Sequence, residues 1–108
     1  MITRKDYLKG KASHHDYYVE IAKDVGIKPD EKTLEKVRRA LDKGDEHLNT
    51  ISMRFWDMWA VSVLAFNRER VLNAFKRRGD YPTQAGLVCM LKNICIYYVS
   101  KAGFESNS

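Results

Sequence analysis

No glycine or proline occurs between Gly44 and Gly79, and this long interval constrains the fold more than any other feature of the sequence. Glycine and proline most often interrupt helices and mark the turns between short strands. Long intervals without them favour helices over many short strands. The 108 residues include only six Gly and two Pro, and 44% of them are hydrophobic, which suffices for a core. We therefore expect an all-α fold in one domain, residues 1–108.

Two short helices are predicted near the N-terminus, at residues 3–9 and 13–25. Each begins with a hydroxyl residue followed three positions later by Asp, in TRKD and in SHHD. This S/T-x-x-D pattern is typical of helix starts, because both side chains accept hydrogen bonds from free backbone N–H groups. Gly10 and Gly26 are placed to end the two helices.

Three longer helices are predicted to follow, at residues 30–43, 50–78 and 83–102, with a frayed tail at 104–108. The second of these is apolar on nearly all sides, which predicts a central helix. Its apolar positions move to another side after Asn67, so we expect either a kink there or a helix end that leaves the bundle and packs elsewhere. The predicted fold is a small bundle of about five helices whose core is formed by the two long C-terminal helices.

Cysteine spacing and hydropathy indicate a protein of a reducing, aqueous compartment. Cys89 and Cys95 lie six positions apart in a predicted helix. Helical rise alone separates such Cα atoms by roughly 9 Å, too far for a disulfide. The N-terminus lacks the apolar segment of a signal peptide, and the most apolar stretch, residues 85–99, is too short to span a bilayer. We expect a cytosolic protein that does not enter a membrane.

Three segments resemble, in the same order, parts of a group of small phage and phage-like proteins: SHHDYYVEIA, DEHLNTISMRFWD and YPTQAGLVCMLKNI. That group carries an HREYY-like stretch, a central DEHxNxIxxxxWD and a C-terminal PSLAxxVCxxKxAA. The matching residues are Asp45, Glu46, His47, Asn49, Ile51, Trp56, Asp57, Val88, Cys89 and Lys92. The chain departs from the pattern at residues 93–96, where the group is Ala-rich and charged. The resemblance implies an accessory, non-virion phage protein of the host cytoplasm and carries no activity with it.

Basic residues concentrate in the segment NRERVLNAFKRRG. They are Arg68, Arg70, Lys76, Arg77 and Arg78. Contact with nucleic-acid phosphates, or with an acidic partner, is the functional interpretation. The structural alternative is that cations stabilise a helix C-terminus and solubilise its exposed side. We favour the structural alternative, because no known nucleic-acid-binding motif accompanies the charge and the net charge of the chain is only +5.

The acids and the histidine of DEHL, at Asp45, Glu46 and His47, raise the question of a metal site. A metal site needs three or four converging ligands with supporting partners. The other histidines, His14 and His15, lie on a distant predicted helix, so the ligands are too few. We favour acids near the start of a helix over a metal site.

Asp57 is the single charge between Phe55 and Phe66. A charge in such apolar surroundings requires a partner or partial solvation. We expect a structural ion pair with Arg54, Arg68 or Lys92, and a larger loss of stability from Asp57→Ala than from Asp45→Ala.

The alternative for Asp57 is a pocket, which His47, Arg54 and Lys92 would also line. Trp56 and Trp59 could likewise line a ligand pocket, although packing in the core is the better interpretation of a tryptophan pair among apolar residues.

The sequence contains no Walker loop, no G-x-G-x-x-G, no G-x-S-x-G, no H-E-x-x-H and no C-x-x-C. We therefore predict a non-enzymatic protein without cofactor or metal, which acts by binding a host or defence-system macromolecule, in the first place a protein. Homo-oligomerisation would help so small a domain. Two alternatives stay open: a nucleic-acid-binding protein that uses the basic helix end, and a pocket that sequesters or processes a nucleotide.

Overall fold

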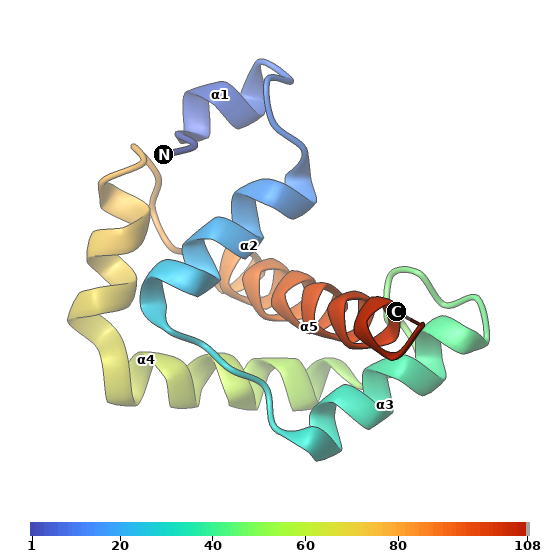
Figure 1. Cartoon of the computed structure of the whole chain (residues 1–108). Coiled ribbons are helices and arrows are strands. Elements are labelled where there is room, and N and C mark those ends of the chain that lie inside the picture. Colours follow the sequence, from blue (N-terminus) through green and yellow to red (C-terminus); the bar gives the residue numbers. More distant parts are fainter. Residues whose placement is uncertain (108) are drawn as a thin grey trace.

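The computed structural model describes the backbone of residues 1–107 and the side chains of residues 1–101. In this part of the chain five α-helices and no strand are present (Figure 1). They are α1 (Arg4–Leu8), α2 (His14–Val25), α3 (Glu31–Asp42), α4 (Met53–Lys76) and α5 (Gln84–Asn107). The prediction of a small all-α bundle is confirmed.

The predicted starts of α1 and α2 are confirmed at the level of single hydrogen bonds. The Thr3 hydroxyl accepts from the backbone N–H of Asp6 at 3.1 Å, while the Asp6 carboxylate accepts from the Thr3 N–H at 3.0 Å. The Ser13 hydroxyl accepts from the Asp16 N–H at 3.0 Å. Gly26 ends α2 with φ +83°, a conformation that glycine adopts without strain.

Helix α4 begins at Met53, later than the predicted residue 50. The Ser52 hydroxyl caps it by accepting from the Phe55 N–H at 3.2 Å. The preceding residues are held as a turn, because the Asp45 carboxylate accepts from the backbone N–H groups of Asn49 and Thr50. A side chain that satisfies these backbone donors locally delays the start of the helix.

The predicted kink of α4 is confirmed. Asn67 has non-helical backbone angles, φ −134° and ψ 31°, and the two halves of the helix turn sharply relative to one another there (Figure 1). The end of α5 differs from the prediction, because the helix continues beyond residue 102 to Asn107. The predicted frayed tail is therefore helical as far as Asn107, and Ser108 lies outside the described residues.

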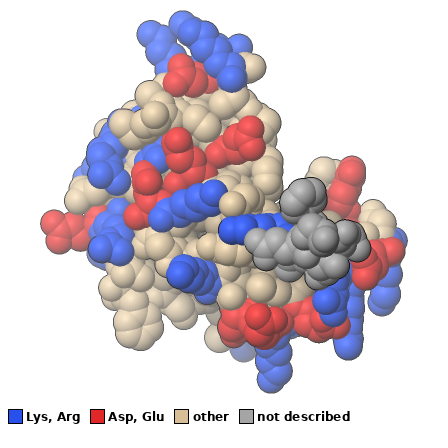
Figure 2. Space-filling view, in the orientation of Figure 1, with Lys and Arg blue, Asp and Glu red and all other residues tan. Residues whose placement is uncertain are grey.

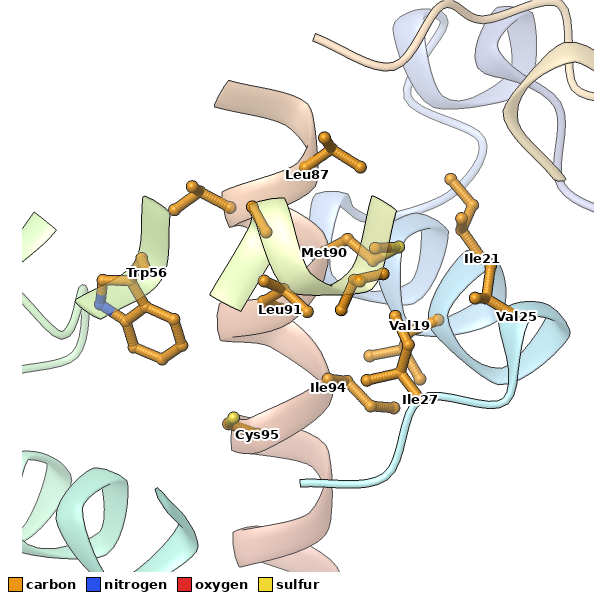
Figure 3. Close-up of a cluster of buried hydrophobic side chains, with 14 of the residues drawn as sticks. Val19, Ile21, Val25, Ile27, Trp56, Leu87, Met90, Leu91, Ile94 and Cys95 are labelled. Carbon is orange, nitrogen blue, oxygen red and sulfur yellow. The ribbon is translucent and has the colours of Figure 1, made fainter. Parts of the chain in front are cut away.

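Helix α5 lies at the centre of the bundle, and α2, α3 and α4 pack around it (Figure 1). Its side chains Leu87, Met90, Leu91 and Ile94 lie between α2 and the start of α4 (Figure 3). Both long C-terminal helices supply core residues, and α2 adds the buried residues Tyr17, Val19, Ile21, Ala22 and Val25. No helix of the described chain is long and apolar enough to cross a bilayer.

The prediction that α4 is the central helix is wrong. Trp56, Ala60 and Val63 face the core, but Met58 and Val61 are each 60% exposed on the other side. A helix that is apolar all round can be central or can carry an exposed apolar face, and the sequence pattern alone does not separate the two. Here α5 is the central helix and α4 is an outer one.

Replacing Ile94 by Ala should lower the free energy of unfolding by about 2–5 kcal/mol, because this fully buried side chain would leave a cavity. Val61→Ala, on the exposed side of α4, should change it by less than about 0.5 kcal/mol. Urea denaturation followed by circular dichroism measures both. Similar losses in the two variants would contradict the central position of α5.

Candidate functional site

Arg78 is buried, only 2% exposed, in the turn directly after α4. Its guanidinium donates to the Glu20 carboxylate at 3.1 and 3.3 Å, to the Asp24 carboxylate, and to the Ala74 carbonyl at 2.7 Å. Its hydrogen-bonding capacity is thus used inside the protein, which fixes the end of α4 against α2. The prediction that Arg78 belongs to an exposed binding surface is wrong.

Asp80 lies two residues further on and is 5% exposed. It accepts hydrogen bonds from the Tyr17 hydroxyl at 2.6 Å, from the Arg4 guanidinium and from the Tyr81 N–H at 2.7 Å. Burial raises the pKa of the Tyr17 hydroxyl, and the bond to Asp80 adds to this effect, so the phenol stays a donor. These groups satisfy one another, which favours a structural role in joining α1, α2 and the turn before α5.

Both cysteines are free thiols, as predicted. Burial raises the pKa of Cys95 to about 12, and burial also raises the pKa of the half-buried Cys89. Since the thiolate is the reactive form, these values favour inert packing residues.

The loop that precedes α4, residues 45–52, is organised by Asp45. Its carboxylate accepts from the Asn49 N–H at 2.9 Å and from both the N–H and the hydroxyl of Thr50 at 2.7 Å. These bonds, those of Thr50 first, lower the pKa of Asp45. The side chain of His47 is exposed, 3.3 Å from Glu46, and among the described residues no three His, Cys, Asp or Glu side chains form a metal-binding group.

Asp57 has no ion-pair partner among the described side chains, so the prediction of a pair with Arg54, Arg68 or Lys92 is wrong. Its carboxylate instead accepts a hydrogen bond from the Gln84 amide at 2.9 Å. The Lys92 ammonium donates to a backbone carbonyl of the 45–52 loop at 3.1 Å. A side-chain amide at the start of α5 replaces the expected cation, because Asp57 is half-buried and water solvates it in part.

The outer side of α4 carries two open grooves that share Met58 and Ser62. The first has a volume of about 480 Å³ and is also lined by Arg54, Asp57 and Val61. The second has a volume of about 390 Å³ and is also lined by Lys28, Asp30, Thr33, Phe55 and Trp59. We call them the outer-face grooves. The four residues of the predicted pocket do not converge on the first groove: Arg54 and Asp57 line it, whereas His47 and Lys92 do not.

The predicted tryptophan pair is divided between core and surface. Trp56 is fully buried, which confirms its predicted place in the core. Trp59 stacks on it with ring centroids 6.0 Å apart, is half-buried and lines the second outer-face groove.

A third groove, of about 790 Å³, lies at the kink of α4, and we call it the elbow groove. Its cationic lining residues are Lys23 on α2, Arg68 and Arg70 on α4, and Arg77 directly after α4. Phe66 also lines it and is 87% exposed. Of the five basic residues predicted as a binding surface, three therefore line one groove, Lys76 is exposed outside its lining, and Arg78 is buried.

On the face shown in Figure 2, positive and negative side chains are interspersed. The chain matches no protein-family model, no curated protein and no solved structure.

The sequence did not lead us to Glu20, to Asp80 or to the exposure of Phe66. Only the exposure of Phe66 had a signal in the sequence, because a phenylalanine directly before a predicted kink can lose its packing partners.

Arg78→Ala should lower the free energy of unfolding by about 2–4 kcal/mol, because it leaves Glu20 and Asp24 without their main partner. The loss stays below that of a fully buried pair, since both carboxylates are about a third exposed. Arg77→Ala is the matched control: its contact with Asp24 is 3.8 Å long and its side chain is 57% exposed, so it should cost less than about 1 kcal/mol. Urea denaturation measures both, and an equal effect would argue against the structural role of Arg78.

The structure reverses the expected order of two aspartate variants. Asp45→Ala should lower the melting temperature more than Asp57→Ala, because Asp45 accepts three hydrogen bonds and Asp57 accepts one. The folded-state pKa of Asp45 is lowered from 3.8. The contribution of Asp45 is therefore complete above its unfolded pKa, and it declines as the pH falls through the folded pKa. The melting temperatures of the parent and Asp45→Ala should begin to converge as the pH falls below about 4; a constant difference would argue against the role of the ionised Asp45 carboxylate.

Proposed function

We propose that this protein is a non-enzymatic phage-type accessory protein that acts in the host cytoplasm by binding a host or defence-system protein through the outer-face grooves of α4. The phage-type origin rests on the resemblance of its three sequence segments to small phage proteins. The docking surface rests on one observation: Met58 and Val61 are each 60% exposed beside open grooves. An exposed apolar area with a polar rim is typical of protein interaction sites.

The shape of this surface favours a helix as the bound element. Met58 and Ser62, one helical turn apart, form a ridge with a groove on each side. Helices pack by placing the side-chain ridges of one into the grooves of the other, and an amphipathic helix in an apolar groove is a recurrent mode of recognition. We infer that the partner contributes an amphipathic helix.

The rim charges specify the partner further. Each groove has one cation and one anion at its edge: Arg54 with Asp57, and Lys28 with Asp30. A complementary helix carries an acidic residue opposite each cation and a basic residue opposite each anion. Such pairs at the rim act mainly on specificity and on the rate of association.

A second copy of the chain fits this surface less well. In an antiparallel two-fold pair that places Met58 against Val61 of the second copy, Arg54 faces Ala65 and Asp57 faces Ser62, so neither charge meets its opposite. If the two Val61 side chains lie on the axis instead, Arg54 faces Arg68. The occupant we propose is therefore a different protein, and self-association is an outcome that the test distinguishes.

Affinity purification from the host, with the tagged parent and with a Met58→Glu, Val61→Glu variant, tests this function. The charges should abolish recovery of the specific partner, because they would be buried against its apolar helix. Leu8→Glu, at a position 66% exposed on α1, is the matched control and should retain the partner. With the purified partner, calorimetry should show binding that weakens at least about tenfold for each single variant.

A synthetic peptide of the partner's amphipathic helix should compete for the site. Retention of every partner by the double variant would overturn the proposed surface. So would a dimer, seen by light scattering, that the same variant dissociates, because the face would then be a contact between copies of this chain.

A further inference from the structure

The elbow groove combines an exposed aromatic ring with several arginines. Arg70 and Arg77 lie seven positions apart after the kink, so they share one side of the second half of α4, and Phe66 lines the same groove from the end of the first half. Arg68 lines the same groove from the turn that follows the kink at Asn67. The end of α2, with Lys23, forms the facing wall.

Phe66 has no structural task that explains its place. It is 87% exposed, the largest exposed fraction among the large hydrophobic residues of the described chain, and among the described side chains no ring stacks on it. The aromatic residues Phe55 and Trp59, earlier in the same helix, pack with Trp56 instead. An exposed flat ring beside cations is the arrangement that proteins use to stack unpaired bases.

The cations of the elbow groove retain unused donors. Within the described part of the chain Arg68 has no ion pair and no hydrogen bond, and Arg70 makes one long bond, 3.4 Å, to the Val25 carbonyl. Arg77 lies 3.8 Å from Asp24, a carboxylate whose closer partner is the buried Arg78. Cations therefore outnumber unpaired acids here, and Glu69 is the remaining acid of the lining.

We infer that the elbow groove binds a segment of single-stranded nucleic acid, with phosphates at Arg68, Arg70 and Arg77 and one base stacked on Phe66. Base stacking on an aromatic ring requires an unpaired base, which favours a single strand over a duplex. An acidic peptide would use the arginines but would leave the flat ring without a comparable contact. The elbow groove shares no lining residue with the outer-face grooves, so this inference goes beyond the proposed protein docking.

The inference is tested by measuring binding affinity through fluorescence anisotropy, with labelled oligothymidine and oligouridine of about fifteen nucleotides, at about 50 and 200 mM salt. Both probes should bind, more tightly at low salt, and more tightly than a duplex of the same length or a poly-glutamate peptide. Phe66→Ala should weaken binding about tenfold, a loss of about 1.4 kcal/mol in the range expected for one stacked base. Tyr81→Ala removes another exposed ring, 77% exposed, and should have no effect.

The double variant Arg68→Ala, Arg70→Ala should reduce the slope of log affinity against log salt by about 1–1.5, as expected for two lost phosphate contacts on a single strand. Arg38→Ala, Arg39→Ala removes the same charge from exposed positions of α3 and is the matched control, with a slope close to that of the parent. Melting curves verify that each variant is folded.

Absence of binding at 50 mM salt would overturn the inference. So would equal affinity for duplex and single strand that Phe66→Ala leaves unchanged, because that result describes unspecific attraction of phosphate. Tighter binding of poly-glutamate would assign the groove to an acidic protein segment instead. The Met58→Glu, Val61→Glu variant should bind oligothymidine like the parent, so failure of the docking proposal and failure of this one are distinguishable.

Discussion

The buried guanidinium of Arg78 is the contact on which the arrangement of the helices depends. It joins the end of α4 to Glu20 and Asp24 on α2. The backbone carbonyl of Arg78 in addition accepts a hydrogen bond from the Arg4 N–H of α1 at 2.8 Å. Asp80 ties the same elements together through Tyr17 and Arg4. An isolated helix as short as α1 is unstable in water, so α1 is helical because this network and its capping box hold it. A buried charge that lost these partners would be costly, which makes alternative packings of the second half of α4 unfavourable.

Because Arg78 fixes the end of α4, the kink at Asn67 allows this single helix to pack against two neighbouring helices, α5 and α2. The first half of α4 buries Trp56, Ala60 and Val63, and the second half buries Val71, Ala74 and Phe75. Packing therefore determines only the inner side of each half. The outer side is free of this constraint, so the apolar residues exposed there do not stabilise the monomer, and an interaction with another molecule is the physical reason we offer for them.

Local features of the fold could be predicted from the sequence, and long-range features could not. The caps at Thr3 and Ser13 depend on neighbouring residues, and the kink after Asn67 depends on a change in apolar periodicity, so both are visible in the chain. Whether Arg77 or Arg78 is buried depends on carboxylates more than fifty positions away. The partner of Asp57, the Gln84 amide, lies 27 positions away and carries no charge that would suggest it.

The distribution of charge determines how such a molecule can recognise a partner. The chain has 19 basic and 14 acidic residues, and on the face seen in Figure 2 groups of both signs lie side by side. Fields of opposite sign from neighbouring groups largely cancel, and salt screens the remainder beyond a Debye length of about 8 Å, so long-range attraction contributes little. Recognition must then come from places where local geometry separates the signs. The elbow groove is such a place, because Arg78 withdraws Asp24 from Arg77 and leaves its arginines facing solvent beside Phe66.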